Sequence, residues 1–129
     1  MEGLNVKEFV SSYLATAAWI TVDAGENDEF TKDAKKIAKE DCLTFIALVI
    51  KEFGTEKAHP LLTVQGNDLT SLTANNFFLT RNGHGTGFWD RPEMYGGQEN
   101  ADKLTAICKE MGIAEVNHIK GKNSKLMFE

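Results

Sequence analysis

The sequence has few of the residues and runs that define specialised protein classes. Its only cysteines, Cys42 and Cys108, lie in apolar helical patterns, which indicates buried thiols in a reducing cytosol. The longest apolar run, residues 42–50, is far shorter than the roughly 18 residues of a membrane span. The first residues lack a charged leader followed by an apolar stretch, so no secretion signal is predicted. We therefore expect a cytoplasmic protein that does not associate with membranes.

The best-known catalytic and cofactor motifs are also missing. There is no P-loop and no G-x-S-x-G elbow, and the close glycines do not open a helix in the dinucleotide-binding pattern. The cysteines and the three histidines (His59, His84 and His118) lack the spacing of zinc ligands. The net charge of −5 argues against a broad nucleic-acid-binding surface, which is usually basic. The sequence thus predicts no cofactor and no metal.

What remains is an ordinary globular composition. The 129 residues suggest one domain, and 42% hydrophobic with 26% charged residues is close to the average of soluble domains. A chain of this length buries roughly two thirds of its unfolded surface, which is enough for a core. Within a single domain over residues 1–129 we expect a helical part (1–53) and a hairpin-helix-hairpin part (75–129).

Three helices are predicted from apolar residues that recur at three- and four-residue steps. Asn5 can cap the first helix, whereas Gly54 and Gly112 are expected to end the second and the third. Residues 42–50 in the second helix are apolar on nearly every side, which predicts the central core helix. The predicted spans are residues 5–20, about 30–53 and about 99–111.

Four short segments are predicted to be strands. Residues 77–81 and 86–90 would form one hairpin, and residues 115–119 and 125–129 would form another around the turn sequence KGKNS. The order is then helix, helix, hairpin, helix, hairpin, with the strands gathered toward the C-terminal half. This order predicts an α+β fold in which N-terminal helices pack on a small antiparallel sheet.

The stretch Leu79–Arg91, LTRNGHGTGFWDR, is the most unusual part of the chain because it combines three glycines with two arginines and a Phe-Trp pair. Asn82-Gly83 is the strongest short signal for a hairpin turn. A turn shifted to Gly83-His84 would move every side chain to the opposite face, and the spacing alone does not decide between the two registers.

Two interpretations of this stretch stay open. It can be a structural hairpin in which Phe78 or Trp89 covers bare glycine backbone. It can also be a surface that receives a planar or anionic group, because arginine offers forked donors, histidine can carry a proton and tryptophan can stack. The candidate binding residues are Arg81, Asn82, His84, Trp89 and Arg91.

A catalytic use of the same stretch would rest on His84 and Asp90 as an acid–base pair, provided that loops fold over them. Asp90 also has a structural interpretation, because it can pair with Arg81 or Arg91, while Pro92 ends the strand.

The sequence NNFFLTRNGHGTGFWDR, with the following helix and strand pair, resembles a family of small bacteriophage and plasmid proteins. Members carry a stretch much like DFWLTRNGHGAGFWDR, and the resemblance covers roughly residues 75–129. This chain departs from them at residues 75–78, where NNFF replaces a Gly-His-Asp-Phe-Trp-like run. The departure removes a histidine and an acid that a catalytic role would use. The resemblance implies a viral or mobile-element origin and a host-cytoplasmic location, but no established activity.

These observations lead to three functional hypotheses. The first is a non-enzymatic phage accessory protein that binds and modulates a host protein, such as a defence or DNA-processing factor, as an inhibitor or counter-defence protein would. The second is a protein that binds a nucleotide or a nucleic-acid end through arginine contacts and stacking on Trp89. The third is a small hydrolase or nuclease that uses His84 and Asp90.

Overall fold

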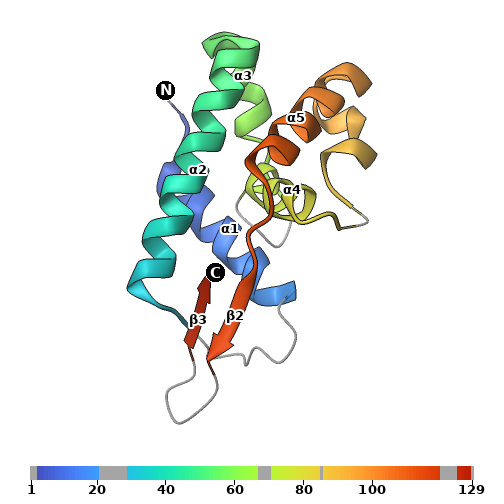
Figure 1. Ribbon diagram of the computed structural model, residues 1–129. Helices are drawn as coiled ribbons and strands as arrows, with labels where there is room; N and C mark the ends of the chain where they lie inside the picture. Colours follow the sequence, from blue (N-terminus) through green and yellow to red (C-terminus); the bar gives the residue numbers. More distant parts are fainter. Residues whose placement is uncertain (1–2, 21–28, 67–70, 85, 120–124, 129) are drawn as a thin grey trace.

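The computed structural model describes residues 3–20, 29–66, 71–84, 86–119 and 125–128. Within these ranges the chain is mostly helical, with five α-helices, two short 3-10 helices and three short strands (Figure 1). The elements are α1 (Val6–Ile20), β1 (Glu29–Phe30), α2 (Lys32–Phe53), α3 (Thr55–Leu62), α4 (Leu72–Arg81), η1 (Phe88–Asp90), η2 (Pro92–Met94), α5 (Gln98–Met111), β2 (Val116–Ile119) and β3 (Lys125–Phe128).

Three of the helices, α1, α2 and α5, were predicted from the sequence, and their ends follow from local capping. The Asn5 side chain accepts a hydrogen bond from the backbone N–H of Glu8 at 3.1 Å, which confirms the predicted cap of α1. Gly54 and Gly112 follow the last residues of α2 and α5, as expected, and both have a positive φ. Helix α3 was not predicted. It contains His59 and Pro60, and the residue before a proline usually avoids the helical conformation.

The predicted fold class, α+β with helices packed on an antiparallel sheet of hairpins, was wrong. Residues 77–81 belong to helix α4 and residues 88–90 to η1, so the first predicted hairpin does not form. The sheet has the strand order β1-β3-β2, and β1 pairs with β3 in parallel through only two residues. The C-terminal strands β2 and β3 are present and run antiparallel, and the predicted turn between them lies outside the described residues.

The end of α4 explains why the hairpin does not form. Gly83 adopts φ 71°, its N–H donates to the carbonyl of Thr80, and the N–H of His84 donates to the carbonyl of Leu79. This pair of hydrogen bonds is the Schellman motif, which ends a helix with a glycine in the left-handed conformation. Asn82-Gly83 therefore ends a helix here. A type I′ hairpin would have used the same dipeptide in a different backbone context.

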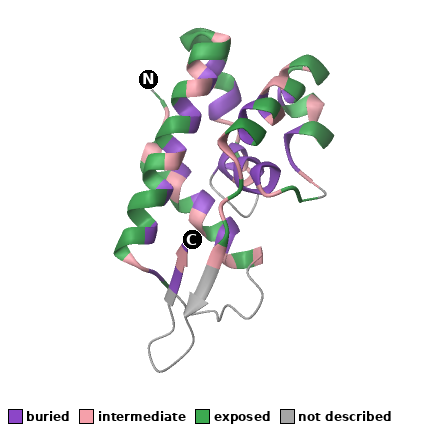
Figure 2. Ribbon diagram, viewed as in Figure 1, coloured by how far each residue is buried: buried purple, intermediate pink, exposed green. Residues whose placement is uncertain are grey.

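Helix α4 lies at the centre of the molecule, between α1, α2 and α5 (Figure 1). Figure 2 shows it buried along almost its whole length. Its Phe77 ring stacks on Phe45 of α2 at 4.2 Å between centroids and on Tyr13 of α1 at 5.2 Å. Phe88 of η1 extends this aromatic cluster, since its ring lies 6.0 Å from Phe45.

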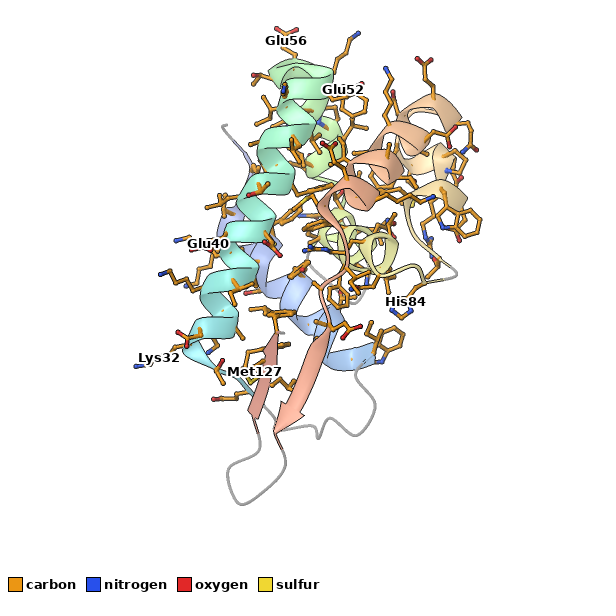
Figure 3. All side chains as sticks on the ribbon, viewed as in Figure 1. Lys32, Glu40, Glu52, Glu56, His84 and Met127 are labelled. Atoms are coloured by element: carbon orange, nitrogen blue, oxygen red, sulfur yellow. The ribbon has the colours of Figure 1, made fainter. Side chains whose placement is uncertain are left out.

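Residues 42–50 do contribute Cys42, Phe45, Ile46 and Val49 to the core, but the expectation that this segment is covered on nearly every side was wrong. In α2 the buried side chains Phe45 and Val49 face the core, whereas Leu43 is 42% exposed and Ala47 is also exposed. Figure 2 shows this exposed stripe on the outer side of α2, and Figure 3 shows the side chain of Glu40 extending from the same helix.

Candidate functional site

Arg81, a predicted binding residue, is a structural residue inside the molecule. It is 6% exposed, and its guanidinium donates to Asp41 at 2.8 Å, to the Tyr13 hydroxyl at 3.0 Å and to the Gly112 carbonyl at 2.7 Å. The same guanidinium lies 5.3 Å from the centre of the Phe77 ring. Burial raises the pKa of Tyr13, and the positive charge of Arg81 offsets part of this rise. Arg81 thus ties together α1, α2 and the end of α5.

Asn82 also makes internal contacts. Its side-chain oxygen accepts a hydrogen bond from the backbone N–H of Ala114 at 2.7 Å. Its side-chain nitrogen donates to the carbonyl of Phe78 at 3.2 Å. Asn82 therefore closes the end of α4 and joins it to the segment that leads into β2.

The Gly87–Asp90 segment is held against α4 by one threonine. The Thr80 hydroxyl accepts a hydrogen bond from the backbone N–H of Phe88 at 3.1 Å, and a Cβ at Gly87 would collide with the same hydroxyl. The Asp90 carboxylate accepts from the backbone N–H of Gly87 at 2.9 Å. Glycine is needed at position 87 because the backbone passes so close to α4. This close contact fixes the residues that follow, including Arg91.

His84 and Asp90 do not form a catalytic pair in the structure. The His84 side chain is exposed, and Figure 3 shows it at the surface, on the side of the molecule away from α2. Among the hydrogen bonds of the described residues, none joins His84 to Asp90, whose carboxylate is used by Gly87. Gly85, between His84 and Thr86, lies outside the described residues.

Trp89 and Arg91, the remaining predicted binding residues, reach the surface. Trp89 is 46% exposed, and Arg91 is half-buried. The Arg91 backbone is fixed on both sides, because its N–H donates to the Phe88 carbonyl and its carbonyl accepts from the N–H of Met94, each at 3.1 Å. These two residues are therefore presented by a short, well-anchored segment.

Arg91 lines a groove of about 610 Å³ between α1, α4 and the η2 segment. This volume is within the usual range of ligand sites. The apolar side chains of Trp19, Leu72, Leu79 and Met94 make up much of its wall. At the α1 side, Asn75 donates to the hydroxyl of Thr16 at 3.0 Å, which joins α4 to α1 beneath the groove. The full lining is Ala15, Thr16, Trp19, Gln65, Gly66, Leu72, Asn75, Leu79, Thr86, Arg91 and Met94.

Among the described residues that line the groove, Arg91 is the one that carries a charge. Its Nε atom is buried and has no hydrogen-bond partner, and no carboxylate among the described residues pairs with its guanidinium. Tyr95 lies close enough to sense this charge. Burial raises the pKa of Tyr95, whereas the hydroxyl's hydrogen bonds with Thr73 and Asn76 and the charge of Arg91 lower it. Arg91 therefore presents to the groove a positive charge that no carboxylate of the described residues neutralises.

Sequence reasoning missed the α1 side of this groove. Trp19 is 81% exposed and lies outside the apolar stripe that predicts α1. A tryptophan off the core face of an amphipathic helix was the available signal, because large exposed aromatics commonly mark contact surfaces. Leu72 and Leu79 could not be placed beside Trp19 without knowing that residues 72–81 form a helix.

In the described part of the chain no group of three or more histidine, cysteine or acidic side chains is arranged to hold a metal ion. None of the described helices is both long enough and apolar enough to cross a membrane. Comparison of the chain with protein-family models, curated proteins and solved structures gives no match. The resemblance of Leu79–Arg91 to the phage and plasmid proteins therefore stays a prediction.

Proposed function

We propose that this chain is a non-enzymatic protein-binding module, an accessory protein of a bacteriophage that binds a host protein in the cytoplasm and modulates it. The observation that carries this proposal is the groove between α1, α4 and η2, with exposed Trp19 and Met94 at its edge and Arg91 in its wall. Tryptophan and arginine contribute a large share of the binding energy at protein interfaces. The viral origin rests on the motif resemblance alone.

The charge distribution favours a protein partner over a nucleic acid. Arg91 is the single cation among the described residues that line the groove, and the guanidinium of Arg81 is used inside the molecule. The chain carries a net charge of −5, which repels a polyanion. An apolar wall with one cation suits a protein segment better than a phosphate backbone, which usually meets several lysines or arginines.

Retention of proteins from a bacterial lysate on the immobilised chain tests this proposal. The comparison uses wild type, Trp19→Ala at the groove and Ile113→Ala as the matched control, since Ile113 is 65% exposed and does not line the groove. We expect one host protein, at fixed stoichiometry and moderate salt, to be retained by wild type and Ile113→Ala and lost from Trp19→Ala. Each variant is first shown to melt like wild type.

Two results would contradict the proposal. One is retention of the same proteins by all three forms, which would mean that the groove is not used. The other is retention of nucleic acid that is released steeply as the salt concentration rises, which would favour the nucleic-acid hypothesis.

A further inference from the structure

We propose that the groove recognises an apolar protein segment that carries a carboxylate, and that this carboxylate binds the guanidinium of Arg91. The inference rests on the proposed function, because it names the chemistry of the partner at the same groove. The two arginines of the motif have different surroundings. Arg81 pairs with Asp41 at 2.8 Å, whereas Arg91 pairs with no carboxylate of the described residues.

The terminal nitrogens of Arg91 point to the kind of acceptor that would bind there. The Nε atom is shielded from solvent, so a ligand in the groove meets the terminal nitrogens, which pair with no carboxylate of the described residues. A carboxylate can accept from both terminal nitrogens in the forked geometry that arginine favours. A single carboxylate also meets far less repulsion from the net charge of −5 than a phosphate chain would.

The surroundings of Arg91 supply the rest of the recognition surface. The Arg91 N–H donates to the Phe88 carbonyl and the Met94 N–H donates to the Arg91 carbonyl, so the backbone of Arg91 is already fixed and loses little freedom on binding. Trp19, Leu79 and Met94 offer apolar contacts to neighbouring side chains of the bound segment. The 81% exposure of Trp19 leaves this wall accessible from solvent, which suits a segment of a larger partner.

A surface-displayed library of random twelve-residue peptides provides the probe. Wild-type protein selects peptides, and those that also bind Trp19→Ala are removed, so that the remaining peptides depend on the groove. We expect these peptides to combine apolar residues with an aspartate or glutamate. A parallel selection on Arg91→Ala, checked to melt like wild type, is expected to keep the apolar residues and lose the acidic one.

One selected peptide is then synthesised with its acidic residue and with the matching amide. For wild type we expect the amide peptide to bind about tenfold more weakly or worse, as for the loss of a hydrogen bond to a charged group. For Arg91→Ala the two peptides should bind alike. Arg91→Lys, which keeps the charge but not the fork, should lie between them. Lys109→Ala, at an exposed lysine outside the groove, serves as the control and should behave like wild type.

The failures of the two proposals are distinguishable. Peptides that require Trp19 but bind equally as acid and amide would overturn the carboxylate inference and leave the protein-binding function in place. A library that yields no Trp19-dependent peptide would contradict both.

Discussion

Helix α4 is buried on nearly every side, whereas the more apolar second half of α2 is buried on one side only, which is the reverse of what their compositions suggest. Residues 42–50 of α2 are apolar apart from one threonine, yet Leu43, Thr44 and Ala47 are exposed. Helix α4 includes Thr73, Asn76, Thr80 and Arg81, and all four of these side chains are buried. The position of a helix among its neighbours, rather than its mean hydropathy, determined which one is central.

The polar side chains of α4 are tolerated in the core because each makes a hydrogen bond to another element or segment of the molecule. Thr73 donates to the Leu61 carbonyl of α3 at 2.6 Å, and Asn76 donates to the Tyr95 hydroxyl at 2.9 Å. Thr80 holds η1, and Arg81 holds α1 and α2. Directional contacts of this kind select one arrangement of neighbours, which apolar packing alone does less well.

The largest expected effect comes from removing the charged contact of α4. Arg81→Ala leaves the Asp41 carboxylate and the Tyr13 hydroxyl without their buried partner, so we expect the free energy of unfolding to fall by about 3 kcal/mol or more. Urea denaturation measures this change. Lys39→Ala, an exposed lysine of α2, is the control and should alter stability by less than about 0.5 kcal/mol. A loss below about 1 kcal/mol for Arg81→Ala would mean that the contacts of Arg81 contribute little to stability.

A matched threonine pair sharpens the comparison. Thr73→Val in α4 removes a hydroxyl that bonds Leu61 and Tyr95, and we expect it to cost about 1–3 kcal/mol. Thr44→Val makes the same chemical change on the exposed face of α2 and should cost less than about 0.5 kcal/mol. Thermal and urea unfolding of both variants give the difference. Equal costs would mean that α4 does not depend on its polar contacts.

The two buried cysteines, Cys42 and Cys108, predict that the free energy of unfolding depends on pH. Burial raises the pKa of the Cys42 thiol from its ordinary value of 9.0, and burial does the same for Cys108 of α5. Above pH 9 the unfolded chain therefore loses these protons while the folded protein keeps them. Stability should fall as the pH rises, by up to about 1.4 kcal/mol per pH unit for each thiol.

Unfolding experiments between pH 7 and pH 10.5 measure this slope. The double variant Cys42→Ala/Cys108→Ala should have a shallower slope than wild type, whatever its stability at neutral pH. The same slope in both proteins would assign the alkaline loss to other groups, of which Tyr13 and Tyr95, with raised pKa values, are the leading candidates.

The smallest expected effect tests the exposed face of α2. Leu43→Ala should change stability by no more than about 0.5 kcal/mol, because Leu43 is already 42% exposed. The same substitution at Leu79 of α4, which is 6% exposed, should cost about 2 kcal/mol or more. A large loss for Leu43→Ala, measured in urea, would show that the outer face of α2 is covered in solution.

The sequence predicted α1, α2 and α5 because apolar residues recur in them at three- and four-residue steps. Their ends could be predicted because a helix cap depends on residues close by in the chain. It misassigned α4 because Phe77, Phe78 and Leu79 form a short apolar run, which periodicity cannot assign to a strand or a helix. The missed signal was the Ser71 hydroxyl, which accepts from the backbone N–H of Ala74 at 3.0 Å and caps the helix. Once α4 was missed, the groove could not be assembled, because α4 forms one of its walls.

The sequence predicted five binding residues alike, but in the structure His84, Trp89 and Arg91 reach the surface while Arg81 and Asn82 make internal contacts. Both arginines belong to one motif and have the same chemistry. Their roles differ because Asp41, forty residues away in the chain, reaches Arg81, while no such partner reaches Arg91 among the described residues. Local sequence thus determined the helix caps, the glycine at the end of α4 and the unusual motif itself. Only tertiary packing decided which helix is buried and which arginine of the motif pairs with a described carboxylate, because both depend on contacts between residues distant in sequence.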